Sequence, residues 1–353
     1  MNMQAFLRSL GVVLVPVLVV LFVAGQLVDD YQLSLLLLGL SLSSLGIAWN
    51  ILVSAGQISL GHVAFFGFPS YCAAVLMTRY GLSLVAAIAI SFLLMVVAVA
   101  VIWRATARLR GVYFALVTLA VAELLLIASN ALTDITGGAA GVAFSLPIFG
   151  VEEHFVAALA VLGLALTTHL AIRHSWVHFA FHTIRLYPES ASAIGINVPI
   201  YKGLALLTSA LLSGVAGLVY SSYVGYLSPH SSFSIDTSLD AQIVSLLGGL
   251  YIVTGPLVGG LLLSAGSEQL RNWFGEAHLF AYGIALIVLT LAWPYGILGA
   301  FQRVWGRMRG RAVHRRPDPN GGTGPARHTG VPGTEVGPTV DSGRRPRTGG
   351  DGG

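Results

Sequence analysis

The sequence predicts an all-α membrane protein, and three observations carry that prediction. Of the 353 residues, 55% are hydrophobic and only 10% are charged, and the mean hydropathy is +0.80. Soluble domains of this length carry far more charge. Apolar runs near the spanning length of about 20 residues recur along the chain, and basic residues gather between them. We therefore expect a polytopic transmembrane bundle over residues 1–302, with roughly 8–10 crossings and some broken or re-entrant helices.

Apolar stretches bounded by polar or turn-forming residues mark the individual spans. Arg8 precedes the first stretch, which we interpret as an uncleaved helix rather than a signal peptide because further spans follow at once. The candidate spans are Leu10–Val28, Leu33–Val53, Ile58–Met77, Leu82–Trp103, Val112–Ser129, Phe155–Ile172, Leu204–Tyr226, Ile243–Ser264 and Leu279–Trp293.

The charged residues between these spans predict their direction, because short loops rich in Lys and Arg stay in the cytoplasm. Basic residues lie before the first span, after the fourth and after the sixth: Arg8, Arg104, Arg108, Arg110, Arg173, Arg185 and Lys202. The acidic pair Asp29 and Asp30 and the loop Ala131–Glu153 then fall outside.

The C-terminal region constrains the number of crossings. From Arg303 onward it holds ten of the nineteen basic residues, against four acids. Such a charge density resists export, so we expect an even number of crossings and both termini in the cytoplasm. Nine complete spans would violate this rule. Glycines and a proline interrupt the eighth candidate, and we infer that Asp240–Arg271 is a pair of broken or short helices, which are common near transport sites.

Residues 303–353 have a different composition from the rest of the chain. They are rich in Gly, Pro, Arg and Thr and have no apolar period. This composition predicts a disordered cytoplasmic tail. Its basic residues favour contact with anionic membrane lipids over a nucleic acid.

The segment Trp49–Tyr71 combines polar residues with helix breakers inside an apolar region. Its polar residues include Asn50, Ser54, Gln57, Ser59 and His62, and Gly56, Gly61, Gly67 and Pro69 lie among them. Polar groups at membrane depth face a bundle interior or a cavity, and broken helices occur where protein or water covers them. The segment is either part of a translocation pathway or a tightly packed helix pair, and its chemistry alone does not separate the two.

Two further features permit both a functional and a structural interpretation. Glu123 lies in the middle of LVTLAVAELLLIASN, where an acid either lines a pathway or forms a hydrogen-bonded strut between helices, and the strut is favoured because one isolated acid gives no ion relay. His174, His178 and His182 recur every four residues and form one stripe on a helix. Two histidines at this spacing can bind zinc. No carboxylate lies on the stripe, so an interfacial cytoplasmic helix is the favoured interpretation and no metal or cofactor is expected.

Motifs for ATP hydrolysis and for covalent catalysis are absent from the sequence. Lys202, the only lysine, is not preceded by a Gly-rich phosphate loop. There is no G-x-S-x-G elbow and no H-E-x-x-H pair, and the single Cys72 excludes an internal disulfide. The chain is therefore not expected to be an enzyme.

Five blocks, in order, resemble permease subunits of branched-chain amino-acid ABC transporters. The resemblance extends from about Leu33 to Gly299 and is closest to the M-type permease of the pair. The blocks are AWNILVSAGQISLGHVAFFGFPSY, RLRGVYFALVTLAVAELLLIASN with LTDITGGAAGV, AIGINVPIYKGLALLTSALLSGVAGLVYSSYVGYLSP, LLGGLYIVTGPLVGGLLL and LAWPYGILG.

That resemblance implies partners as well as a fold. It implies a second homologous permease subunit, two cytoplasmic ABC ATPases and an extracytoplasmic binding protein, all at the cell membrane. From their polar chemistry at membrane depth, Asn50, Gln57, Ser59, His62 and Glu123 are our candidates for the translocation pathway or the permease interface. The cargo would be branched-chain amino acids, or urea or another small amide.

The cytoplasmic loop before AIGIN departs from the family pattern. In the family this loop is rich in arginine and acids and forms a short helix that docks on the ATPase. Here Arg185, Ala191, Ala193, Gly195 and Asn197 keep the pattern, but Leu186, Tyr187 and Pro188 replace acids and Glu189 is displaced by one position. We expect a short helix beginning at Pro188, with small residues including Ala191 entering a groove on the ATPase. A divergent ATPase or weak coupling remains an alternative, as does a stand-alone secondary transporter or channel.

Overall fold

The computed structural model describes residues 6–8, 10–109, 111–144, 146, 150–277, 280, 283, 284, 287 and 296–300. All of them belong to the unit formed by residues 1–307. Most of the predicted span Leu279–Trp293 and the whole predicted tail, residues 303–353, lie outside the described residues.

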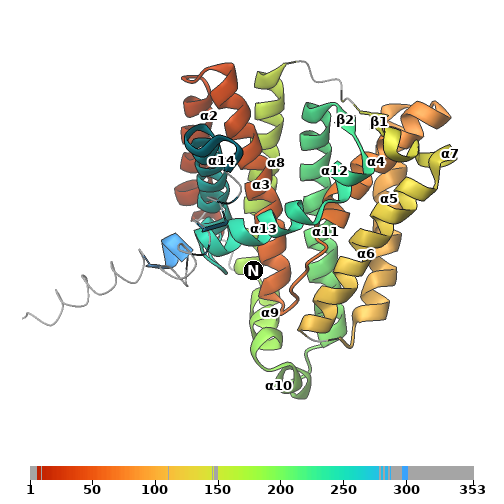
Figure 1. The fold of residues 1–353 in the computed structure, drawn as a ribbon. Helices are drawn as coiled ribbons and strands as arrows, with labels where there is room; N and C mark the ends of the chain where they lie inside the picture. The colour runs from red at the N-terminus through yellow and green to blue at the C-terminus, as the bar shows by residue number, and fades with distance from the viewer. Residues whose placement is uncertain are drawn as a thin grey trace, which may run out of the picture. The chain divides into compact units, whose positions relative to one another are not determined.

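Six helices among the described residues are long and apolar enough to cross a membrane, which confirms the predicted fold class (Figure 1). They coincide with the first, second, fourth, fifth, sixth and seventh candidate spans. These helices are Phe6–Gly25, which contains η1 (Leu10–Leu14) and α2 (Val15–Gly25), α3 (Asp30–Ser54), α5 (Leu84–Thr106), α6 (Val112–Ala131), α8 (Val151–Arg173) and α11 (Val198–Val224).

Helix α3 is the centre of the bundle. It packs against α8, α11, α13 (Ile235–Gly248) and α14 (Gly255–Phe274), and 83% of its most apolar stretch is buried, against 28% in α5 and α6. Small residues make this packing close: a Cβ on Gly260 of α14 would lie 2.7 Å from the carbonyl oxygen of Gly39 in α3. Spanning helices associate through close backbone contact at small residues, because the hydrophobic effect provides no driving force between helices in lipid.

The third predicted span, Ile58–Met77, starts too early. Helix α4 begins at Val63 and ends at Tyr80, and residues 55–62 form a non-helical connection from the end of α3. We call residues 55–62 the first break. The glycines and polar residues of this segment end α3 and move the start of α4 to Val63.

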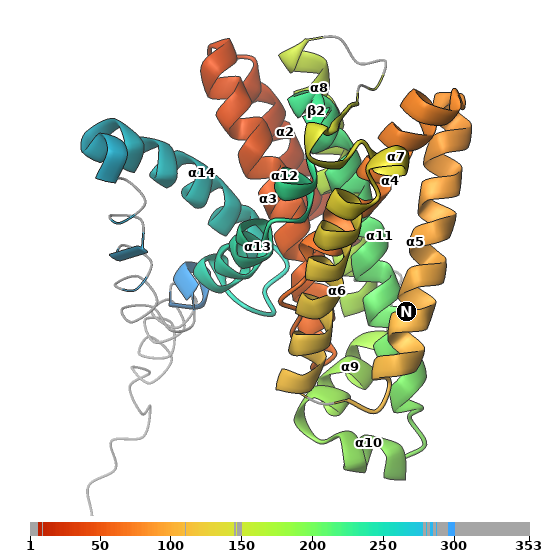
Figure 2. The same ribbon diagram turned by 45° about the vertical axis from the view of Figure 1, so that its right-hand side comes forward.

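The eighth predicted span is divided into two helices, as the sequence predicted. Short α12 (Pro229–Phe233) leads into α13, and residues 249–254 separate α13 from α14. We call residues 249–254 the second break. Figure 2 shows α14 turning away from α13.

The acidic pair Asp29 and Asp30 and the acidic loop before α8 lie at one end of the bundle. A Cβ on Gly25, at the end of α2, would touch the ring of Phe155 near the start of α8. The imidazole of His154 lies 3.3 Å from the hydroxyl of Ser222, near the end of α11. The same end holds α7 (Thr133–Thr136), η2 (Gly138–Ala140) and an antiparallel pair of two-residue strands, β1 (Val142–Ala143) and β2 (Tyr226–Leu227). We call this the acidic end.

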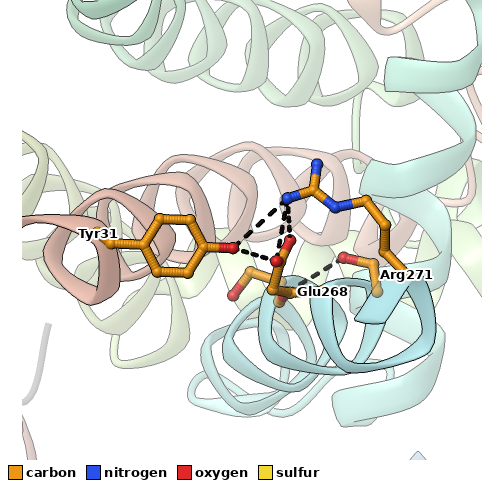
Figure 3. Close-up of polar contacts among 5 residues, drawn as sticks. Tyr31, Glu268 and Arg271 are labelled. Atoms are coloured by element: carbon orange, nitrogen blue, oxygen red, sulfur yellow. Dashed lines mark hydrogen bonds and ion pairs between the residues drawn. The ribbon is translucent and has the colours of Figure 1, made fainter. Parts of the chain in front are cut away.

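Helix α14 finishes at the acidic end. The hydroxyl of Tyr31, at the start of α3, donates to the carboxylate of Glu268, which forms an ion pair of 2.8 Å with Arg271 (Figure 3). Since α11 also finishes there, the chain enters the bundle through α12 and α13 and returns through α14 to the end it left. This re-entrant path adds no net crossing, in agreement with the predicted broken pair.

The opposite end carries Arg104, Arg173, Arg185 and Lys202, the only lysine of the sequence. Lys202, near the start of α11, donates to the carbonyl oxygen of Leu109 at 3.0 Å, after α5. The ring of Phe6 packs on His174, after α8. Helices α9 (Trp176–Leu186) and α10 (Pro188–Ala193) lie between α8 and α11. We call this the basic end.

Candidate functional site

The first break is covered by side chains from neighbouring helices. The backbone N–H groups of Leu60 and Gly61 donate to the hydroxyl of Thr118 in α6, at 3.1 and 3.4 Å. The N–H of Val63 donates to the hydroxyl of Ser238 in α13, at 2.8 Å. Non-helical backbone at membrane depth is tolerated only where protein or water satisfies it. The neighbouring helices therefore satisfy the non-helical backbone of the break and stabilise it.

Glycine is required at the point where the first break crosses α6. A Cβ on Gly61 would lie 1.8 Å from the carbonyl oxygen of Thr118, far inside van der Waals contact. The backbones themselves touch here, so any side chain would separate the break from α6.

His62 ends the first break and bonds to α11. Its Nε2 lies 2.9 Å from the hydroxyl of Ser213 and 3.3 Å from that of Ser209. Both serines donate their own hydrogens to carbonyl oxygens of Ala48 and Ser209. The hydroxyl oxygens are thus left as acceptors, so Nε2 carries the proton. Nδ1 of the same ring faces no described hydrogen-bond partner.

Asn50 ties the second break to α3. Its side-chain oxygen accepts from the N–H of Tyr251 at 3.0 Å, and its amide nitrogen donates to the carbonyl oxygen of Ile252 at 3.3 Å. Tyr251 has φ 65°, an unusual conformation for a bulky residue. A buried amide that bonds both to an N–H and to a carbonyl oxygen holds such a turn in place.

The predicted pathway residues of Trp49–Tyr71 are buried in this conformation. Asn50, Ser59 and His62 are 0% exposed and Gln57 is 2% exposed. The structure brings Asn50 and His62 to the two breaks. Atoms Oε1 of Gln57 and Oγ of Ser59 have no partner among the described residues, which is rare for buried polar atoms.

Burial makes a direct prediction for cysteine labelling of the first break. On a background without Cys72, Ser59→Cys is expected to resist a small aqueous thiol reagent in the resting protein, whereas Ile58→Cys, at a side chain 45% exposed, should react. The measurement is the fraction labelled against time. Rapid labelling of Ser59→Cys at rest would show that the break opens without a partner or nucleotide.

Glu123 is not the buried strut that the sequence favoured. It lies on the exposed face of α6, with Leu124 and Ile127, which are 64% and 65% exposed. The adjacent Ala122 is buried beside Val63 at the start of α4, and Glu123 lies at mid-span depth because it is near the middle of α6. A carboxylate there is costly against lipid. This face of α6 therefore needs cover from protein or water outside the chain.

The loop before AIGIN forms the short helix that Pro188 predicted. Pro188 occupies the first turn of α10 and Glu189 follows it near the positive end. The expectation that Ala191 enters a partner's groove is wrong. Ala191 is 0% exposed and packs with Ala180, Ile184 and Ile196 inside the chain.

Other residues of this loop remain accessible. Glu189, Ala193 and Gly195 are exposed, as are the neighbouring Ser192 and Ile194. A docking surface on α10 would therefore use its last turn rather than Ala191.

Arg185 connects α9 to both breaks. Its guanidinium lies 3.8 Å from the ring centroid of Tyr251 in the second break, a stacking that is favourable for arginine. A Cβ on Gly56, in the first break, would lie 3.1 Å from the Cα of Arg185. Movement of α9 would therefore change the contacts of Arg185 with both breaks.

In the described part of the chain, no three His, Cys, Asp or Glu side chains are close enough to hold an ion, the histidine stripe included. The rings of His178 and His182 are 6.5 Å apart, and His174 packs on Phe6. Buried Ala180, Phe181 and Ile184 hold one face of α9 against the bundle. The opposite face is exposed.

Several residues that hold the site were not identified from the sequence. Thr118, Ser209, Ser213 and Ser238 cap the first break, and Tyr251 forms the turn of the second. Ser209 and Ser213 are four residues apart in an apolar helix, a spacing that puts both on one face. That spacing could have indicated a shared polar face on α11, but it does not show that His62 is the residue the two serines bind.

Comparison with known proteins matches this architecture to one family. A family model described as branched-chain amino acid transport system, permease component, matches residues 31–293. The chain is 26% identical over 287 residues to the high-affinity branched-chain amino acid transport system permease protein LivM of Escherichia coli (strain K12), covering 72% of this chain and 67% of LivM. It is 28% identical over 137 residues to LivH of the same organism, covering 38% of this chain and 43% of LivH. No solved structure matches. Because the family model matches most of the 353 residues, the chain belongs to the family of permease components of branched-chain amino acid transport systems.

Proposed function

We propose that this chain is the M-type permease subunit of an ATP-driven importer for branched-chain amino acids. It works with a second permease chain, two cytoplasmic ATPases and an extracytoplasmic binding protein. The basic end faces the cytoplasm, and both termini lie on that side. Family membership supports the assignment of the chain as a permease component. The observation that carries the mechanism is the contact of Arg185 with both breaks.

The proposed mechanism transmits movement from the cytoplasmic end to the bundle interior. The ATPase docks on the exposed turn of α10, and α9 moves with it because Ala191 and Ile196 pack against Ala180 and Ile184. Arg185 then displaces the two breaks, the first of which holds the unpartnered polar atoms of Gln57, Ser59 and His62. In the displaced conformation these atoms face the cargo or water.

The exposed face of α6 is the proposed contact with the second permease chain. Leu116, Glu123, Leu124 and Ile127 lie on it. Two such faces enclosing the translocation path would cover the apolar residues and give Glu123 a polar surrounding. This arrangement removes the cost of a mid-span acid against lipid.

Transport by the assembled complex tests the proposal. The chain is reconstituted in proteoliposomes with the permease, ATPases and binding protein encoded beside it, and uptake of radiolabelled leucine is measured with and without ATP. Uptake is expected only with ATP and the binding protein. The chain alone is expected to hydrolyse no ATP, because Lys202 lies outside any phosphate loop. Uptake by the chain alone, driven by an ion gradient, would instead identify a stand-alone transporter. Urea in place of leucine tests the cargo separately.

A further inference from the structure

A cavity of about 270 Å³ lies at the basic end. It is enclosed by the C-terminal ends of α3 and α8, by α9, and by Tyr251 of the second break. Its polar lining is Ser54, His169, Arg173, His178, His182 and Arg185. We call it the basic cavity.

The lining of the basic cavity carries positive charge without a balancing acid. No carboxylate is among the lining residues, and neither Arg173 nor Arg185 forms an ion pair within the described part of the chain. Arg185 uses the face of its guanidinium on Tyr251, which leaves the N–H donors at the edge of the group for another acceptor. The cavity therefore suits an anion.

His169 gives a second, independent indication of a ligand. It is only 6% exposed and lines the basic cavity, yet its Nδ1 has no hydrogen-bond partner among the described residues. Buried polar atoms are nearly always paired. An acceptor atom in the cavity would pair it.

The surroundings of the cavity indicate where the anion comes from. Trp176 and Phe179 of α9 are exposed, and their ring centroids are 4.8 Å apart. Exposed aromatic residues at the end of a spanning helix lie at the level of lipid headgroups. Basic pockets between spans on the cytoplasmic side bind anionic headgroups.

We propose that the basic cavity binds the phosphate group of an anionic phospholipid, with Arg173, Arg185 and the histidines as donors. Two parallel N–H groups of a guanidinium match two phosphate oxygens. Because Arg185 also contacts both breaks, a bound lipid would hold α9 against them. This site is independent of the transported cargo.

The proposal predicts a pH dependence. Burial, followed by the charges of Arg173, His182, Arg185 and His174, lowers the pKa of His178 below its ordinary value of 6.5. No acid is among these neighbours, so His178 is neutral at pH 7 and gains charge only below its lowered pKa. A bound phosphate favours the charged form. Lipid binding should therefore tighten as the pH falls below 6.5.

The test uses the full-length chain purified in a neutral detergent. Short-chain phosphatidylglycerol and phosphatidylcholine are titrated separately, and each apparent Kd is measured. Phosphatidylglycerol is expected to bind more tightly, and Arg173→Gln should weaken it about tenfold, the effect of losing one charged hydrogen bond. Arg108→Gln is the matched control, because Arg108 is an exposed arginine of the same end outside the cavity. Arg185→Lys keeps the charge and should retain most of the binding.

Two results would overturn the proposal. Equal binding of the two lipids, or equal loss in Arg173→Gln and Arg108→Gln, would show that the cavity charges only compensate the negative ends of α3 and α8. Inorganic phosphate serves as the third ligand. Competition by millimolar phosphate with phosphatidylglycerol supports recognition of the phosphate group, whereas phosphate binding without lipid preference would refute the lipid as its source.

Discussion

Gly259→Ala is expected to lower the free energy of unfolding of the purified chain by about 3 kcal/mol, at the upper end of what overpacking costs. A Cβ at this position would lie 1.9 Å from the carbonyl oxygen of Val244. The obstacle is the backbone of α13, so no side-chain rotation relieves it. Helices α13 and α14 must separate, and the second break between them must change shape.

Gly266→Ala is the matched control in the same helix. No atom lies within 4 Å of its Cβ position, so the added methyl group meets no neighbour. Alanine is favoured over glycine in a helix by roughly 1 kcal/mol, and this variant should be neutral or slightly more stable. The measurement is the midpoint of unfolding in detergent for the three proteins. Equal midpoints for the two variants would contradict the close crossing of α13 and α14.

The sequence predicted where helices break better than it predicted what holds the breaks. Glycines and Pro256 are local signals, and they placed the second break within Asp240–Arg271 as the structure has it. The bond between Asn50 and Tyr251 joins residues 201 positions apart. No local pattern contains such a pairing, because it depends on how α3 and α14 pack.

Burial was the property that sequence reasoning judged least well. Ala191 and Glu123 are the two examples. Ala191 was expected on a docking surface because it is small, but small residues also fit where a loop packs on itself. Glu123 was expected to form a hydrogen-bonded strut between helices because an acid at mid-span depth is costly, but it lies on a face of α6 that the chain leaves uncovered. In both cases the residue type is compatible with two environments, and only the packing of neighbouring elements distinguishes them.

Ala193→Trp is expected to abolish ATPase co-purification and ATP-driven leucine uptake while the membrane bundle stays folded. Ala193 lies exposed in the last turn of α10, beside Ser192 and Ile194. A tryptophan here adds a large side chain to the proposed docking surface without entering the chain's own core. Loss of docking would remove the only energy source of the proposed importer, so uptake should fall to the level without ATP.

Ala191→Trp separates this effect from a folding defect. Ala191 packs in the cluster with Ala180, Ile184 and Ile196, and a tryptophan there would displace α10 from α9, because a filled core does not accept so large a side chain. We expect a lower midpoint of unfolding in Ala191→Trp and an unchanged midpoint in Ala193→Trp. The measurements are unfolding in detergent, the amount of ATPase recovered with the tagged chain, and leucine uptake. If Ala193→Trp recovers ATPase at the level of the unaltered chain and still transports leucine, α10 is not the docking element, and movement must reach Arg185 and the two breaks through a different part of the basic end.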